Sequence, residues 1–265
     1  MRRALLAIAL LISGAYAAGL GSLFYYQRSL IFPAPSLPWP EEAGFETVSY
    51  RTEDGLTLRG LYRAAQPGQP TIVFFHGNGD SLSGSLVSTE LYAAAGHGLL
   101  LVEYRGYGGN PGAPDEAGLY QDGRAARGWL AAEGIQPERQ ILIGYSLGTG
   151  VAAQLALEQA PARLILIAPY TSLPDVVTHR FGGLVPTSLV KDHLDTAAKI
   201  ARIGCPVLIM HDRDDASVPA AQGEALARAS KGAKLLLFNG HGHQLGFSEE
   251  AQQAGLTWLQ ANQTS

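Results

Sequence analysis

The hydrophobic pattern opens on one long apolar run. Arg2 and Arg3 precede residues 4–26, which only serines and tyrosines interrupt. A helix that crosses the hydrocarbon core of a bilayer needs about 20 predominantly apolar residues, and this run reaches that length. Tyr25 and Tyr26 lie where interfacial aromatic side chains gather, and the two arginines favour a cytoplasmic N-terminus. We therefore predict a single-pass membrane helix, with the rest of the chain on the outer (periplasmic or extracytoplasmic) side.

Two other interpretations of this run stay open. Ala15-Tyr16-Ala17 has the small residues of a signal-peptide cleavage site, although a signal peptide usually has an apolar region of only about 7–15 residues. A core helix of the folded domain is the second alternative, but such a helix normally shows a polar face, and none is visible here.

A proline-rich segment separates this run from the remaining chain. Residues 32–40 contain four prolines, a composition that favours extended, semi-rigid backbone. We expect a stalk here, whose aromatic residues can also rest on the membrane or on the domain surface. The predicted organisation is a membrane anchor or signal peptide at 1–28, a stalk at 29–42 and one folded domain at 43–265.

Within the folded domain, short apolar runs alternate with segments of helical periodicity. Runs without a polar face are typical of parallel strands that helices cover on both sides. The first two strands flank Glu53-Asp54-Gly55 and predict an antiparallel pair, so the sheet is mixed and mostly parallel. Strands are expected at 47–51, 56–62, 71–75, 99–104, 140–143, 163–168, 207–211 and 234–238, and helices at 82–95, 115–132, 147–159, 220–229 and 249–261.

One long insertion interrupts this alternation, between Pro169 and Ile203. We predict a short cap over the carboxyl ends of the strands, where α/β sheets place their chemistry. Its apolar residues, among them Phe181, Val185 and Leu189, either line an acyl pocket or pack on the core.

Composition excludes several classes of function. The net charge of −4 and pI of about 6.0 give no electrostatic basis for nucleic-acid binding. Cys205 is the only cysteine, which excludes an intramolecular disulfide and a cysteine-based metal cluster. With 265 residues, the chain is long enough to bury a large core without such cross-links.

The candidate nucleophile is Ser146, in the segment Gly144-Tyr145-Ser146-Leu147-Gly148. This G-x-S-x-G pattern follows an apolar strand and precedes a helix. In that setting the serine occupies a sharp, strained turn that exposes its hydroxyl. Larger side chains at Gly144 and Gly148 would collide with the backbone of this turn. The alternative is a glycine-rich turn with an inert serine.

A serine nucleophile needs a base and an acid that orients the base, and both should follow Ser146 at strand ends. Three acids compete after the strand at 207–211, namely Asp212, Asp214 and Asp215. His241 and His243 follow the last strand, and we favour His243, which lies further along the loop. The two histidines can instead bind a metal, but no further ligands complete such a site.

The remaining histidines and glycines suggest supporting roles. His76 and His211 end strands and are expected to hydrogen-bond loop backbone. The loop after the strand at 71–75 reads His76-Gly77-Asn78-Gly79, and glycines let backbone approach a substrate closely. We predict an oxyanion hole formed by the amides of Asn78 and Leu147. The alternative for this loop is an ordinary glycine turn.

Taken together, these motifs resemble one group within the α/β-hydrolase superfamily, the Bem46-like and ABHD-type membrane-anchored serine hydrolases. The resemblance extends over nearly the whole chain and implies the α/β-hydrolase fold. The family pattern H-G-x-x-D-x-x-V-P maps onto residues 211–219 and implies that Asp215 is the acid, and the final G-x-x-H implies that His243 is the base. Asp212 and Glu103 stand where the family usually has Gly and Asp. The matching segments are Gln27…Leu30-Ile31-Phe32-Pro33, His76-Gly77-Asn78, Tyr104-Arg105-Gly106-Tyr107-Gly108, Gly144-Tyr145-Ser146-Leu147-Gly148, Pro169-Tyr170-Thr171-Ser172-Leu173 and Pro206-Val207-Leu208-Ile209-Met210-His211.

The resemblance implies hydrolysis of an ester, thioester or amide without a cofactor. The membrane helix and the small cap favour a small-molecule substrate that is acylated or lipid-like. One alternative is a peptidase specific for N-terminal residues, with Asp175, Asp192 or Asp195 of the cap binding the substrate amine. A second alternative is a non-catalytic, membrane-tethered binding module, although every catalytic role here has a candidate residue.

Overall fold

The computed structural model describes residues 1–35 and 37–261. Ser36, in the predicted stalk, and residues 262–265, at the end of the predicted folded domain, lie outside the described residues. A single sheet organises the domain, with strand order β1-β2-β4-β3-β5-β6-β7-β8. The strands are β1 (Glu46–Arg51), β2 (Thr57–Arg63), β3 (Thr71–Phe75), β4 (Gly98–Val102), β5 (Gln140–Tyr145), β6 (Arg163–Ile167), β7 (Val207–Asp212) and β8 (Lys234–Phe238).

The sheet is mixed and mostly parallel, as predicted. β2 pairs antiparallel with both β1 and β4, and every pairing from β4 to β8 is parallel. All residues of β3, β4 and β5 are buried, which is why these strands read as continuous apolar runs in the sequence. The parallel pairing brings the carboxyl ends of β5, β7 and β8 to the same edge of the sheet.

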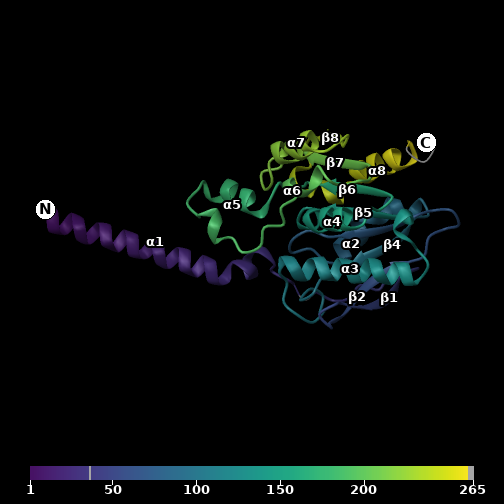
Figure 1. Ribbon diagram of the computed structural model, residues 1–265, viewed down its shortest axis with the longest axis horizontal. Coiled ribbons are helices and arrows are strands. Elements are labelled where there is room, and N and C mark those ends of the chain that lie inside the picture. Colours follow the sequence, from purple (N-terminus) through teal and green to yellow (C-terminus); the bar gives the residue numbers. More distant parts are fainter. Residues whose placement is uncertain (36, 262–265) are drawn as a thin grey trace.

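Helices cover both faces of the sheet (Figure 1). Side chains alternate along each strand, so Val73 and Phe75 join the core on one face while Ile72 and Phe74 join the core on the other. The first core lies under α3 (Glu116–Ala132), α4 (Leu147–Glu158) and α7 (Ala220–Ala229), and the second lies under α2 (Leu82–Ala94) and α8 (Glu249–Ala261).

The N-terminal helix α1 (Arg2–Ile31) projects away from the domain (Figure 1), and none of its residues is buried. Among the helices of the described chain, α1 alone is long and apolar enough to cross a membrane. It continues through Ile31, beyond the expected end of the anchor at residue 28. It ends there because the residue before a proline, here Phe32 before Pro33, is disfavoured in helical conformation.

The segment predicted as a stalk contacts the domain. Phe32 is 3% exposed and packs in the first core. Further along, the Arg59 guanidinium carbon lies 4.3 Å from the centroid of the Trp39 ring. Trp39 Nε1 donates a hydrogen bond to Thr47 Oγ1. Trp39 therefore rests on the domain surface, one of the two positions considered for the aromatic residues, whereas Phe32 enters the core.

The cap lies between β6 and β7 and contains α5 (Leu173–Phe181), the short turn η2 (Thr187–Leu189) and α6 (Ala197–Ile200). The Ser172 hydroxyl accepts a hydrogen bond from the Asp175 N–H at the start of α5, and Gly182 ends that helix in left-handed conformation at φ 57°. The sequence analysis predicted the cap but assigned no helix within it.

Candidate active site

Ser146 occupies the sharp turn between β5 and α4. Its φ of 48° and ψ of −114° lie in a region that residues with side chains rarely adopt, which indicates local backbone strain. The Ser146 N–H donates a hydrogen bond to the Ile167 carbonyl on the neighbouring strand β6, at 2.9 Å. A Cβ atom at Gly148 would overlap the Phe75 carbonyl oxygen, so this turn requires glycine two residues after the serine.

The structure brings the predicted serine, histidine and acid into one hydrogen-bonded chain. Ser146 Oγ lies 2.9 Å from His243 Nε2, and His243 Nδ1 lies 2.7 Å from Asp215 Oδ2. Asp215 follows β7, and His243 lies in η3 (Gly242–Phe247), shortly after β8. Their convergence follows from the parallel strands, whose carboxyl ends share one edge.

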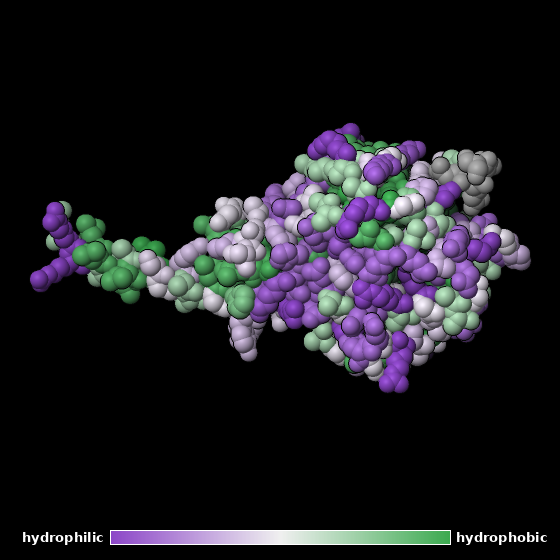
Figure 2. Space-filling model, in the orientation of Figure 1, coloured by the Kyte–Doolittle hydropathy of each residue, from purple (hydrophilic) through white to green (hydrophobic). Residues whose placement is uncertain are grey.

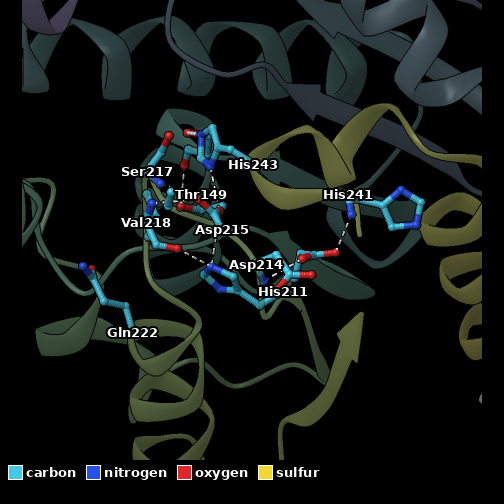
Figure 3. A network of polar contacts seen from close by, with 12 residues as sticks. Thr149, His211, Asp214, Asp215, Ser217, Val218, Gln222, His241 and His243 are labelled. Carbon is cyan, nitrogen blue, oxygen red and sulfur yellow. Dashed lines mark hydrogen bonds and ion pairs between the residues drawn. The ribbon is translucent and has the colours of Figure 1, made fainter. Parts of the chain in front are cut away.

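The Asp215 carboxylate is fully buried and hydrogen-bonded on both oxygens. Oδ1 accepts the backbone N–H groups of Ser217 and Val218, at 2.8 and 2.9 Å. Figure 3 shows His243 and His211 on opposite sides of this carboxylate, with His211 Nε2 3.5 Å from Oδ2. Burial alone would raise the pKa of Asp215, but hydrogen bonds from His211, His243 and Val218 hold it well below its usual range. The group therefore remains an anion that can orient His243.

The competing acids and histidine stabilise loops instead. Asp212 accepts the N–H groups of Asp214 and His241, and Asp214 accepts the N–H of Gly240. His241 points away from His243 (Figure 3) and pairs with Glu250, Nε2 to Oε2 at 2.9 Å. Among the described residues, no group of three histidine, cysteine or acidic side chains can hold a metal ion.

Both residues predicted for the oxyanion hole line the cleft beside Ser146. Leu147 is the first residue of α4, where a backbone N–H has no intrahelical partner. Asn78 lies in the loop after β3. A Cβ at Gly77 would lie 3.2 Å from the Tyr145 ring and 3.4 Å from Ser146 Cβ, so this loop packs directly against Ser146. Their action as oxyanion donors stays a prediction.

A buried pair that the sequence analysis did not foresee supports this loop. His76 Nε2 lies 2.9 Å from Glu103 Oε1, and both side chains are excluded from solvent. Burial would lower the pKa of His76, but the hydrogen bond and charge of Glu103 raise it overall. His76 Nδ1 also contacts the Gly77 carbonyl, at 2.8 Å, in line with the expectation that His76 bonds loop backbone. Glu103, noted only as a departure from the family pattern, thus lies behind the loop that carries Asn78.

The cleft around Ser146 has a volume of about 470 Å³, and its walls are polar and apolar in nearly equal measure. Tyr145, Tyr170, Leu173, Val176 and Phe247 contribute to these walls. Tyr145 was missed as a site residue, although it precedes the nucleophile. Its hydroxyl donates a hydrogen bond to the His243 carbonyl, and its ring centroid lies 5.8 Å from that of His243. It therefore helps to hold the loop that carries His243.

The three cap acids considered for a peptidase make other contacts. Asp175 accepts hydrogen bonds from Thr171 and Ser172, and Asp195 accepts one from the N–H of Ala198. Asp192 pairs with Arg28 of α1 at 2.9 Å. None of these three acids lines the cleft, so no observation favours amine recognition by them.

Comparison with known proteins places these features among hydrolases. Residues 72–193 match the alpha/beta hydrolase family. The sequence is 38% identical over 230 residues to an uncharacterized protein of Mycobacterium tuberculosis, covering 82% of this chain and 80% of that one. It is 32% identical over 223 residues to the human alpha/beta hydrolase domain-containing protein 17B, covering 77% and 70%. Protein bem46 of Schizosaccharomyces pombe is 29% identical over 222 residues, with 77% and 74% covered. These similarities confirm the resemblance to Bem46-like and ABHD-type proteins.

Solved structures show the same architecture. An esterase of Pyrococcus furiosus superimposes with a TM-score of 0.69, covering 86% of this chain and 96% of that one at 17% identity. At this identity the likeness concerns the fold alone, and it confirms the predicted α/β-hydrolase fold.

Proposed function

Because the chain belongs to the alpha/beta hydrolase family, we propose that it is a serine hydrolase that cleaves an ester, thioester or related acyl bond through an acyl-enzyme. The observation that carries this proposal is the hydrogen-bonded chain from Ser146 through His243 to Asp215. A fold alone does not fix a function, so the argument rests on this geometry in the cleft.

In the proposed mechanism, Ser146 Oγ attacks the substrate carbonyl while His243 Nε2 takes up its proton. Asp215 holds His243 in the required orientation and stabilises the imidazolium that forms. The amides of Asn78 and Leu147 stabilise the oxyanion, an interaction whose loss typically costs about 3 kcal/mol of transition-state stabilisation. His243 then protonates the leaving group, and water, activated by the same histidine, releases the acyl group. These steps need no cofactor.

We also propose that α1 is a single-pass anchor with a cytoplasmic N-terminus and an extracytoplasmic catalytic domain. Its length and apolar composition support a span, and Arg2 and Arg3 support the orientation. One contact between α1 and the cap supports retention of the whole helix in the mature protein. The Tyr16 hydroxyl, which cleavage after Ala17 would remove, donates a hydrogen bond to the Leu184 carbonyl at 2.6 Å.

A fluorophosphonate probe tests the nucleophile in the full-length, detergent-solubilised protein. We expect the wild type to become covalently labelled and the Ser146→Ala variant to remain unlabelled. Ser217→Ala is the matched control, because Ser217 also lines the cleft and is exposed. This control should be labelled like the wild type. A folded wild type that stays unlabelled would overturn the proposal, as would equal labelling of the Ser146→Ala variant.

A further inference from the structure

A second cavity, of about 210 Å³, lies between α1 and the cap. Figure 2 shows hydrophobic side chains gathered where α1 meets the domain. The lining is apolar except for one glutamine. We call this space the α1–cap cavity, and its lining residues are Leu20, Leu23, Phe24, Gln27, Leu30 and Ile31 of α1 together with Val177, Phe181, Val185, Leu189 and Val190 of the cap.

One face of α1 forms half of this wall. At 100° per residue, the six lining residues of α1 fall within an arc of about 120° on the helix surface. Four residues of that arc are partly buried, namely Leu20, Leu23, Gln27 and Ile31, and two are exposed, namely Phe24 and Leu30. Residues outside the arc, such as Gly21, Ser22 and Tyr25, are all exposed. Ala18 lies on the opposite side of the helix and is exposed. The anchor helix therefore has a face toward the cap and a face toward its surroundings.

Polar contacts fix the position of α1 relative to the cap. The Gln27 side chain donates a hydrogen bond to the Leu189 carbonyl and accepts one from the Lys191 N–H, at 3.0 and 2.8 Å. Arg28 donates to both oxygens of Asp192, whose side chain is only 3% exposed. These contacts lie at the end of α1 nearest the domain, so the cavity is part of the docked arrangement of helix and cap.

The α1–cap cavity adjoins the cleft that contains Ser146. Ile31 belongs to the walls of both, and the successive residues Val176 and Val177 of α5 line the cleft and the cavity respectively. Ile31 therefore lies between the two spaces, and an elongated apolar group whose carbonyl lies at Ser146 enters the cavity by passing this side chain. A head group remains on the polar side of the cleft, near Asn78 and Asp80.

We propose that the α1–cap cavity binds the fatty-acyl chain of a membrane lipid ester, so that the anchor helix is itself part of the substrate site. The inference rests on the proposed hydrolase function and names its substrate class. A lipid is the favoured occupant because half of the wall belongs to a helix long and apolar enough to span a bilayer, which places the cavity beside the hydrocarbon region. The acyl chain then passes from bilayer to cleft without crossing water.

Chain-length selectivity of the full-length protein in detergent tests this site. The substrates are p-nitrophenyl palmitate and p-nitrophenyl butyrate. Leu23→Trp and Val177→Trp fill the cavity from its two walls, and Ala18→Trp is the matched control on the far side of α1. For either cavity variant we expect the ratio of kcat/KM for palmitate to that for butyrate to fall at least tenfold, and for Ala18→Trp to equal that of wild type. An unchanged ratio in both cavity variants would overturn the proposal.

A binding measurement tests the acyl site independently of catalysis. The Ser146→Ala protein is irradiated with diazirine-bearing palmitic acid, and labelled residues are mapped by mass spectrometry. We expect labelling of Val177 or Phe181 in the cap, its loss in a Leu23→Trp background and its persistence in an Ala18→Trp background. Cap labelling in a protein whose folded wild type is not labelled by the fluorophosphonate would retain the acyl site and refute the hydrolase proposal. Turnover with no cap labelling would refute the acyl site alone.

Discussion

At the scale of single residues, two histidine–glutamate pairs with the same separation differ in their surroundings. His76–Glu103 and His241–Glu250 each place Nε2 2.9 Å from a carboxylate oxygen. The side chains of the first pair are 0% and 2% exposed, and those of the second are 30% and 65% exposed. Solvent screens the second pair, so we expect only the first to contribute strongly to stability.

Glu103→Gln should therefore destabilise the protein in a pH-dependent way. Since Glu103 raises the pKa of His76 above its usual 6.5, the stabilisation is fully present below pH 6.5 and is lost as the pH rises through the folded-state value. We expect a cost of about 3–5 kcal/mol at pH 5.5 and a smaller one at pH 9. Thermal unfolding of wild type and variant at both pH values measures this. Glu250→Gln should change Tm little at either pH, and a Glu103→Gln effect that grew with pH would contradict the assignment.

The places of Ser146, Asp215 and His243 could be predicted from the order of the strands and from the family spacing. The serine, the acid and the histidine all follow strands that end at one edge, so their convergence was foreseeable. Sequence reasoning alone left Asp212, Asp214 and Asp215 in competition, because three acids in four positions have the same chemistry. The choice depends on which backbone amides each carboxylate meets in the folded loop, and in the structure Asp215 alone of the three contacts His243.

At the scale of elements, close approach between β3 and the first turn of α4 requires glycine. The Cβ that Gly148→Ala introduces would overlap the Phe75 carbonyl, whereas a Cβ at Gly128 of α3 would meet no atom within 4 Å. Both positions are helical, so a comparison of the two substitutions distinguishes the effect of steric crowding from that of helix propensity.

We expect Gly148→Ala to destabilise the protein by about 1–3 kcal/mol, the usual cost of overpacking, and to reduce fluorophosphonate labelling of Ser146. Gly128→Ala should stabilise by up to about 1 kcal/mol, because alanine favours a helix more than glycine does. Chemical denaturation of the detergent-solubilised variants gives both values. Equal effects of the two substitutions would show that the Phe75 contact does not restrict the turn.

Strands could be predicted better than the cap, for a physical reason. β3 was predicted with its observed bounds because all its residues are buried between two layers of helices, which favours a continuous apolar run. β8 was also predicted with its observed bounds, although it lies at the edge of the sheet, because four apolar residues follow the exposed Lys234. Helix α5 has only Leu173 fully buried, so hydrophobic periodicity gives little indication of it. Its start was nevertheless marked by local chemistry, since Ser172 caps it and Pro174 lies in its first turn.

At the scale of the whole molecule, one guanidinium joins three parts of the chain. Arg28 of α1 contacts Asp192 of the cap and Asp115, the residue that caps α3, at 2.9 and 3.1 Å. Asp192 also accepts the N–H of Glu116 at the start of α3. Since Asp192 is buried, removal of Arg28 leaves a buried carboxylate without its cationic partner.

Arg28→Ala should therefore loosen the cap. We expect trypsin to cleave after Arg180 and Lys191 about tenfold faster than in the wild type, which corresponds to roughly 1.4 kcal/mol of local opening. Mass spectrometry of early digestion products measures these rates. Arg124→Ala is the control, because Arg124 pairs with Glu158 on the surface away from the cap. Equal cap cleavage in the wild type and Arg28→Ala would mean that the cap is held without this contact.

The burial of Phe32 directly after α1 has a consequence for kinetics. With the helix in a bilayer and the next residue fixed in the core of the domain, no flexible tether separates the two. The cleft is then held at one height and one tilt above the membrane, and a substrate of the proposed membrane-lipid class would reach it by lateral diffusion in two dimensions. Its rate should follow the mole fraction of substrate in the surface instead of the bulk concentration, and addition of inert lipid should slow it by dilution.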